Sequence, residues 1–249
     1  ESMITAVIFD MDGVIADSEY FNAKAKTFIL KTAGIEVDWH YHDKFLGTTH
    51  EYMWTEMKKE FESLDKEVLY YIDQWVKTRK ELIDQEGLKP MPGVVDLIDI
   101  KEKGFHLAVA SSSLKEDIMT NMNTFGITDC FEAFISGSEC ENGKPDPEIF
   151  QKAAEAIGQK AANCIVVEDS EAGVKAAKSA KNVKCIGYAP EGAIKQDLHQ
   201  ADTVVKVISD KLIEYIIGKI SKIKNRQRSY RKRALSIFFI KNFLVKKRR

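Results

Sequence analysis

Two carboxylates separated by one residue follow directly on an apolar run. Asp10 and Asp12 flank Met11 and come after the run Ala6–Phe9. Because residues i and i+2 of a strand point to the same side, both acids face one reacting centre if the extended geometry continues past the run. Two like charges at that spacing favour a cation between them, and hard carboxylate oxygens suit Mg²⁺. The spacing therefore predicts a metal and phosphate site at the end of a strand.

Three other segments place polar side chains in similar positions. Each lies at the end of an apolar run or just before a helix: Ser111 after residues 107–110, Lys144 between Gly143 and Pro145, and Glu168-Asp169 after residues 165–167. An acid pair followed by a glycine is also typical of a plain turn, because glycine supplies a permissive backbone. Open α/β folds bind ligands at the carboxyl ends of their strands, so four such segments favour a site.

Taken in order, the acid pair, the serine, the lysine and the second acid pair resemble the haloacid dehalogenase superfamily of phosphohydrolases and phosphomutases. Within that superfamily the chain resembles the branch of β-phosphoglucomutase and phosphoglycolate phosphatase. The resemblance extends from Ile4 to about Ile217. It implies transfer of a phosphoryl group from a monoester. Such a reaction needs an in-line nucleophile, neutralised phosphoryl oxygens and a proton for the leaving oxygen.

The resemblance implies a role for each acid. Asp10 is the nucleophile that forms an aspartyl-phosphate, which water then hydrolyses. Asp12 is the acid and base that protonates the leaving alkoxide and then activates the water. Mg²⁺ is held by Asp10, Asp169 and the backbone carbonyl of Asp12. Glu168 is either a further metal ligand or a group that supports the ligands.

The same resemblance implies that Ser111, Ser112 and Lys144 hold the transferring phosphoryl oxygens. Two of these residues also have a purely structural alternative. Ser111 could cap the next helix, although Ser113 with Glu116 fits a capping box better. Lys144 could be an ordinary solvated loop lysine.

Two departures from the mutase pattern favour a phosphatase. Sugar phosphomutases of this family carry a histidine shortly after the acid pair, near the place where this chain has Phe21. They also carry an arginine in a Gly-x-x-Arg stretch of the cap, which here ends in His50, so a titratable group replaces a permanent cation. We therefore expect a Mg²⁺-dependent phosphatase of a small phosphorylated metabolite, with a sugar phosphate as the substrate class. A β-phosphoglucomutase-like phosphomutase and a catalytically silent binding protein are the alternatives.

Strands and helices alternate along most of the chain. Apolar runs predict strands near residues 6–9, 105–110, 133–136, 164–167, 183–188 and 203–205. Helices are expected to begin near Val94, Ser113, Asp146, Ser170 and Gly192, with Asp146 as an N-cap. This alternation predicts an α/β fold with a Rossmann-like parallel sheet that helices cover on both faces.

One long helical stretch, residues 17–88, interrupts the alternation. Its expected helices span residues 19–31, 50–61 and 66–84, the last with Asp65 as N-cap. Within it, Trp54 and Trp75 are interpreted as core residues and His50 as a surface histidine. We expect residues 17–88 to form an inserted helical cap domain on a core domain of residues 3–16 and 89–218. The resemblance implies that this cap moves over the active site.

The composition is that of an ordinary globular protein, with 44% apolar and 30% charged residues in a chain of 249. No apolar run approaches the length that spans a bilayer, so we expect a cytoplasmic protein. The four cysteines form no Cys-x-x-Cys pair and accompany no histidine cluster, which disfavours zinc and disulfides.

Charge is distributed unevenly along the chain. Residues 219–249 hold 13 basic and no acidic residues, which leaves 24 basic against 38 acidic residues before them, a net charge of −14. An acidic body does not suggest a nucleic-acid enzyme, so the expected partner is a small phosphorylated metabolite. We expect the basic tail 219–249 to be a solvated or disordered extension, with contact to anionic lipid or RNA as the alternative.

Overall fold

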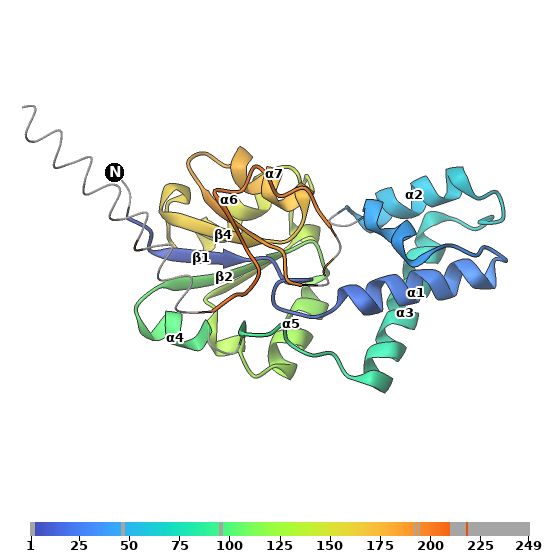
Figure 1. Ribbon diagram of the computed structural model, residues 1–249, viewed down its shortest axis with the longest axis horizontal. Coiled ribbons are helices and arrows are strands. Elements are labelled where there is room, and N and C mark those ends of the chain that lie inside the picture. Colours follow the sequence, from blue (N-terminus) through green and yellow to red (C-terminus); the bar gives the residue numbers. More distant parts are fainter. Residues whose placement is uncertain are drawn as a thin grey trace, which may run out of the picture.

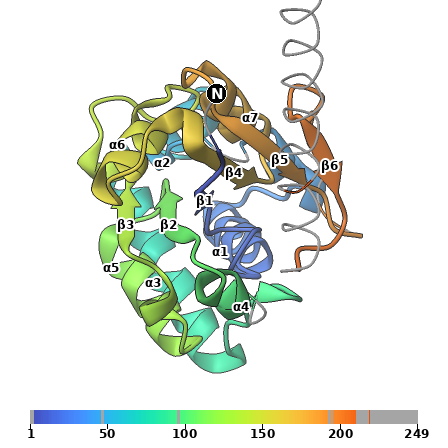
Figure 2. The same cartoon turned by 90° about the vertical axis from the view of Figure 1, so that its left-hand side faces the viewer.

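The computed structural model describes residues 3–45, 48–94, 97–191, 193, 195–209 and 218. It contains one parallel sheet with the strand order β3-β2-β1-β4-β5-β6 (Figures 1 and 2). The strands are β1 (Ala6–Phe9), β2 (His106–Ser111), β3 (Ala133–Ser136), β4 (Cys164–Glu168), β5 (Lys184–Tyr188) and β6 (Thr203–Val205). The helices are α1 (Glu19–Thr32), α2 (His50–Glu60), α3 (Val68–Glu86), α4 (Leu97–Glu102), α5 (Lys115–Thr124), α6 (Glu148–Ala156) and α7 (Glu171–Ser179).

Strand β1 lies in the middle of the sheet and is buried on both faces. Its side chains alternate between two hydrophobic clusters, because successive residues of a strand point to opposite sides. Val7 and Phe9 pack with residues of α4 and α5, whereas Ala6 and Ile8 pack with residues of α6 and α7. Helices therefore cover both faces of the parallel sheet, which confirms the expected fold class (Figure 2).

The strand order places a switch point beside β1. The chain proceeds outward through β2 and β3, then returns to add β4 on the other side of β1. At this point the chain continues across the sheet in opposite directions from neighbouring strands, which leaves a crevice at their carboxyl ends. Open α/β sheets bind their ligands in such a crevice. Asp10 follows β1, and Glu168 and Asp169 lie at the end of β4, so the acids of both motifs flank this point.

Helices α1, α2 and α3, with the 3₁₀ helix η1 (Trp39–Phe45), all come between β1 and β2 and lie together at one end of the molecule (Figure 1). They bury a third hydrophobic cluster of their own. At its centre Trp54 is fully buried and stacks on Tyr71 with ring centroids 5.3 Å apart. Trp54 is therefore a core residue, as expected. The domain boundaries at residues 16, 88 and 218 stay predictions.

Two helices begin later than their expected caps. Helix α3 starts at Val68 after Glu67, which gives no side-chain cap, so the expectation of a cap at Asp65 is wrong. Helix α5 starts at Lys115 after Leu114, so Ser113 does not cap it. The Ser113 hydroxyl instead donates a hydrogen bond to Asp12, so it is not available to cap the helix.

Other local expectations fare differently. Helix α6 begins at Glu148 with Pro147, and not Asp146 as expected, at the N-cap position. The Asp146 carboxylate nevertheless accepts a hydrogen bond from the Glu148 N–H at 2.9 Å. No helix is present in the described residues between 189 and 202, where one was expected from Gly192. All four cysteines are free. Within the described part of the chain, no helix is long and apolar enough to cross a membrane. The basic tail 219–249 lies outside the described residues.

Candidate active site

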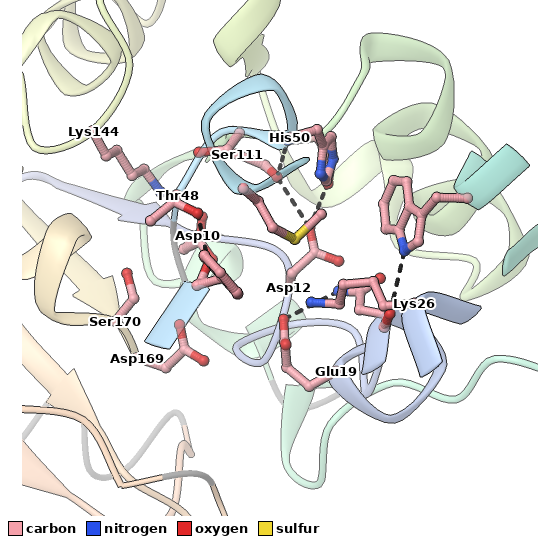
Figure 3. A pocket seen from close by; sticks show the side chains of 16 residues that line it. Asp10, Asp12, Glu19, Lys26, Thr48, His50, Ser111, Lys144, Asp169 and Ser170 are labelled. Atoms are coloured by element: carbon pink, nitrogen blue, oxygen red, sulfur yellow. Dashed lines mark hydrogen bonds and ion pairs between the residues drawn. The ribbon is translucent and has the colours of Figure 1, made fainter. Parts of the chain in front are cut away.

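The turn after β1 carries both acids of the first motif. Asp10 is 7% exposed, and its N–H donates to the Val167 carbonyl at 3.0 Å, which holds it against the end of β4. The chain then reverses, with the Gly13 N–H donating to the Ala16 carbonyl at 2.9 Å. Gly13 has a φ of +78°, in the left-handed region that favours glycine. This turn points the side chains of Asp10 and Asp12 into one cavity (Figure 3).

Lys144 lies inside the site and is only 8% exposed. Its ammonium donates to Asp10 Oδ1 and to Glu168 Oε1, both at 2.6 Å. A buried ammonium is stable only when acceptors replace water, and these two carboxylates do so. The alternative of a solvated loop lysine is therefore wrong.

Three carboxylates surround the position where a metal would bind. Asp10, Glu168 and Asp169 each offer one oxygen, and these oxygens all lie within 4.8 Å of one another. Burial, with the neighbouring carboxylates, raises the pKa of Asp10 to about 8 and that of Asp169 well above its usual range. Groups that resist ionisation when alone are stabilised as anions by a divalent cation, and this hard oxygen donor set fits Mg²⁺.

Glu168 is the most fully engaged of the three acids. One oxygen accepts from Lys144, and the other accepts from the Ser170 N–H at 2.9 Å and the Ser170 hydroxyl at 3.0 Å. Gly173 on α7 makes room for it, because a Cβ at that position would lie 1.8 Å from a Glu168 carboxylate oxygen. These contacts leave Glu168 less free to bind a metal than Asp169.

Asp12 is surrounded by donors. Its Oδ1 accepts from the Ser18 hydroxyl at 2.5 Å, and its Oδ2 accepts from the Ser113 hydroxyl at 2.5 Å. Ser111, at the end of β2, lies 3.4 Å from the same Oδ2 and also accepts the Ser113 N–H at 3.1 Å. Ser112 lines the cavity beside them. Ser113, for which only a capping role was expected, therefore belongs to the site.

Arg79 is a site residue that was not found from the sequence. It lies on α3, is 6% exposed, and places a guanidinium nitrogen 3.7 Å from Asp12 Oδ1. Its Nε donates to Asn22 Oδ1 at 2.6 Å, which fixes its direction. One signal was available: Tyr71, Trp75 and Arg79 are spaced by four residues and form the buried face of α3. A permanent cation on such a face is a functional candidate.

His50 is half-buried and forms part of the cavity wall, so it is not the plain surface histidine that was expected. Its ring lies against Trp75, with centroids 4.1 Å apart. Burial and the nearby cations of Lys26 and Arg79 lower the pKa of His50 to about 4. His50 is thus neutral near pH 7. Trp75 is buried as expected, and it also lines the cavity.

The cavity is enclosed by both halves of the molecule and has a volume of about 80 Å³. The sheet side contributes the acids, serines and Lys144, and the helical side contributes a second polar group of residues (Figure 3): Glu19, Asn22, Lys26, Thr48 and His50. Lys26, like Arg79, was not singled out from the sequence, although its position three residues before Ile29 puts it on the buried face of α1.

Comparison with known proteins places this site in a family. Residues 7–188 match the haloacid dehalogenase-like hydrolase family, so the chain belongs to that family and is an enzyme of the phosphatase type. A phosphorylated carbohydrates phosphatase of Thermotoga maritima is 31% identical over 70% of this chain and 81% of its own length. The β-phosphoglucomutase structure from Clostridium difficile has a TM-score of 0.76 at 28% identity, covering 89% of this chain and 99% of that one.

A plant protein is also similar to this chain. The chloroplastic protein SUPPRESSOR OF QUENCHING 1 of Arabidopsis thaliana is 33% identical over 88% of this chain. This chain spans only 20% of the length of that relative.

Proposed function

We propose that this protein is a Mg²⁺-dependent phosphatase of a small phosphorylated metabolite, with a sugar phosphate as its substrate class. The observation that carries the proposal is the buried cluster of Asp10, Lys144, Glu168 and Asp169 at the switch point of the sheet. The name of the Thermotoga relative supports a phosphorylated carbohydrate as substrate. Bound Mg²⁺ would be held by Asp10, Asp169 and the Asp12 carbonyl, and would neutralise charge between the anionic nucleophile and the anionic phosphoryl group.

In the first chemical step, Asp10 attacks phosphorus and the bond from phosphorus to the leaving oxygen breaks. The product is an aspartyl-phosphate, and Asp12 gives a proton to the leaving alkoxide. Lys144, Ser111 and Ser112 would donate hydrogen bonds to the phosphoryl oxygens and so stabilise their negative charge during the transfer. In the second step Asp12 takes a proton from water, which attacks phosphorus and frees Asp10.

The contacts around Asp12 support its role as acid and base. Ser18, Ser113 and Arg79 hold its two oxygens from three different elements. A fixed carboxyl group keeps its geometry towards the leaving oxygen, which general acid catalysis requires. The three hydrogen bonds that Glu168 accepts, one from Lys144 and two from Ser170, favour Glu168 as a supporting group over Glu168 as a ligand.

The helical part, residues 17–88, would act as a cap that opens for substrate. The cavity of about 80 Å³ is well below the roughly 300 Å³ of the smaller ligand pockets, so a sugar phosphate needs the two parts to separate. One contact across the mouth is tight: a Cβ on Gly143 would lie 3.0 Å from Thr49 Cγ2. Glycine next to Lys144 lets the cap close fully.

A β-phosphoglucomutase-like phosphomutase is the second candidate, because the structural similarity to that enzyme is close. A mutase must hold a second phosphate while the first is transferred. Here Phe21 is buried, His50 is neutral and Arg79 is engaged by Asp12 and Asn22. These features favour water over a sugar hydroxyl as the acceptor. A cytoplasmic location, and tail contacts with lipid or RNA, stay predictions from sequence alone.

The test is phosphate release across a panel of sugar phosphates with and without Mg²⁺, with glucose 6-phosphate formation from β-glucose 1-phosphate followed in parallel. Phosphate release without isomer formation is expected for the wild type, and no turnover for Asp10→Asn. Isomer formation without net phosphate would establish the mutase instead. Substantial Mg²⁺-dependent activity in folded Asp10→Asn protein would remove Asp10 as nucleophile.

A further inference from the structure

Lys26 is a buried lysine whose ammonium has no hydrogen-bond acceptor among the described residues. It lies on α1, is 6% exposed and lines the cavity on the side opposite Lys144 (Figure 3). Within the part of the chain that the structure describes, its ammonium has neither a hydrogen bond nor an ion pair. An ammonium carries three N–H donors, and the Lys26 nitrogen is not among the fully buried unpaired atoms, so it opens on the cavity. A molecule that fills the cavity without supplying an acceptor would bury these donors unsatisfied, which is costly.

Glu19 faces the same space from the same helix. Glu19 and Lys26 are two turns apart on α1, and both line the cavity. Burial raises the pKa of Glu19 and lowers the pKa of Lys26, and the charge of each group opposes the shift in the other. The two side chains are thus electrostatic neighbours, yet they form no ion pair. They present one acceptor and one donor to the cavity.

The other cation on this side is already neutralised. Arg79 lies 3.7 Å from Asp12 Oδ1 and donates to Asn22, while His50 is neutral near pH 7. With Glu19 balancing Lys26, the helical side of the cavity carries no surplus positive charge. A leaving group with a second anion would be repelled by Glu19 as well as attracted by Lys26, and would meet no surplus of positive charge.

We propose that Glu19 and Lys26 are specificity-determining residues that bind neighbouring hydroxyls of an uncharged sugar or polyol leaving group. This inference rests on the proposed phosphatase function. A hydroxyl is both donor and acceptor, so it can accept from Lys26 and donate to Glu19. The rings of Phe45 and Trp75 line the same side and offer apolar surface to the carbon skeleton. Glu19 in turn disfavours leaving groups that carry a carboxylate or a second phosphate.

The competing explanation is purely structural. Asp43, on η1, also interacts electrostatically with Lys26, and its Oδ1 is buried without a hydrogen-bond partner among the described residues. On that explanation Lys26 is only the counter-charge of Asp43, and its removal would leave substrate choice unchanged. Stability alone would change.

The experiment compares Lys26→Met and Glu19→Gln with Lys24→Met as the matched control. Lys24 lies on the same helix but is exposed and contacts Tyr20 and Glu86. Three substrates are assayed with Mg²⁺: the best sugar monophosphate, 2-phosphoglycolate, and p-nitrophenyl phosphate, which has neither a hydroxyl nor a second anion. The readout is the ratio of kcat/KM between substrates, which cancels losses that affect all of them equally. Thermal unfolding checks each fold.

We expect both cavity variants to lower the ratio of sugar monophosphate to p-nitrophenyl phosphate about ten- to a hundredfold, the usual effect of losing a charge-assisted hydrogen bond. Glu19→Gln also raises the ratio of 2-phosphoglycolate to p-nitrophenyl phosphate, because Lys26 is then unbalanced. Lys24→Met changes neither ratio. The isosteric Glu19→Gln variant keeps the test valid if Lys26→Met does not fold.

Two outcomes overturn the inference while leaving the phosphatase function in place. One is an active wild type whose substrate ratios do not change in the cavity variants, which would make Lys26 the counter-charge of Asp43. The other is a wild type that prefers 2-phosphoglycolate or a sugar bisphosphate tenfold or more, which would make Lys26 an anion site. No Mg²⁺-dependent hydrolysis of any substrate would overturn the proposed function, and this inference with it.

Discussion

Gly13 shows how little room the first turn leaves beside the metal-binding acids. A Cβ at this position would lie 2.1 Å from Asp169 Oδ2, and the backbone φ is +78°. The left-handed conformation alone costs a non-glycine residue about 1–2 kcal/mol. The clash adds to this strain, because the Asp169 carboxylate must move to make room.

Gly13→Ala is therefore expected to weaken Mg²⁺ binding and to lower kcat/KM at least about a hundredfold, more than backbone strain alone would do. Gly34→Ala is the matched control, because Gly34 has a φ of +75° with no atom within 4 Å of an added Cβ. Mg²⁺ titration of activity distinguishes the two variants. Equal losses in both would show that strain, and not displacement of Asp169, is responsible.

The site residues fall into two groups by how far the sequence could predict them. Asp10, Ser111 and Asp169 lie in contiguous motifs at strand ends, and parallel pairing of the strands brings them together. Lys144 lies in a similarly contiguous motif in the loop before α6. Arg79 and Lys26 lie in helices whose local pattern shows only a buried face. Which buried position meets the cavity depends on how the helices pack on the sheet, so these residues needed the structure. The expectation that Ser113 caps the next helix was wrong, because its hydroxyl donates to Asp12, which is far from it in the sequence.

At the scale of elements, helix α3 connects the helical part to the chemistry. Its buried face carries Trp75 into the cavity wall and Arg79 to Asp12. Asn22 of α1 accepts from both side chains, from the Trp75 indole through its backbone carbonyl and from Arg79 through its side chain. The two helices therefore set the position of Asp12 together.

Arg79→Gln is expected to lower kcat about tenfold or more with little change in KM, because the acid and base loses one of the groups that position it. Lys80→Gln, at the neighbouring exposed position paired with Asp84, is the control. Steady-state kinetics with the best sugar phosphate give the split. A rise in KM at constant kcat would instead show that Arg79 binds substrate.

Two histidines, His42 that is buried and His50 that is half-buried, make the helical part sensitive to acid. Burial and neighbouring lysines lower the pKa of His42 to about 3, and the pKa of His50 is about 4. Below about pH 6.5 these histidines bind protons in the unfolded chain but stay neutral in the folded protein. The free energy of unfolding, which is at its full value above that pH, therefore decreases as the pH falls towards 4. Each histidine contributes a slope of up to about 1.4 kcal/mol per pH unit.

Urea unfolding between pH 7 and pH 4.5 is expected to show this loss, with a shallower slope in His42→Gln. His40→Gln is the control, because the His40 ring is exposed and pairs with Asp43. If His42→Gln and the wild type lose stability in parallel, His42 is not the titrating group. Carboxylates would then have to account for the acid sensitivity.

At the scale of the whole molecule, the site concentrates negative charge where the sheet is best buried. Asp10, Glu168 and Asp169 share one ammonium, that of Lys144, in contacts of 2.6 Å to the first two. The fold stabilises this arrangement with two hydrophobic clusters, one on each face of the sheet. The same clusters follow from the alternating apolar residues of the strands, which is why the fold class could be predicted.

Because these like charges lie close together, we expect the acids that bind the metal to lower the stability of the metal-free protein. Asp169→Asn should raise the metal-free melting temperature by about 2–8 °C, since one of three clustered carboxylates is removed, and should abolish activity. The wild type should be stabilised by Mg²⁺, by about 2.7 kcal/mol at a hundredfold excess over Kd, and the variant much less. Differential scanning calorimetry with EDTA or Mg²⁺ measures both. A variant that gains as much from Mg²⁺ as the wild type would place the metal elsewhere.

If Asp10 is the nucleophile, it carries the phosphoryl group during turnover, and that group can be trapped on it. Wild-type protein is mixed with Mg²⁺ and the best sugar phosphate, quenched in acid within the first turnovers, and digested for mass spectrometry. The peptide that contains Asp10 should carry one phosphoryl group, and the same peptide from Asp10→Asn should carry none. Steady phosphate release with no phosphorylated Asp10, or with the group on another residue, would contradict the account.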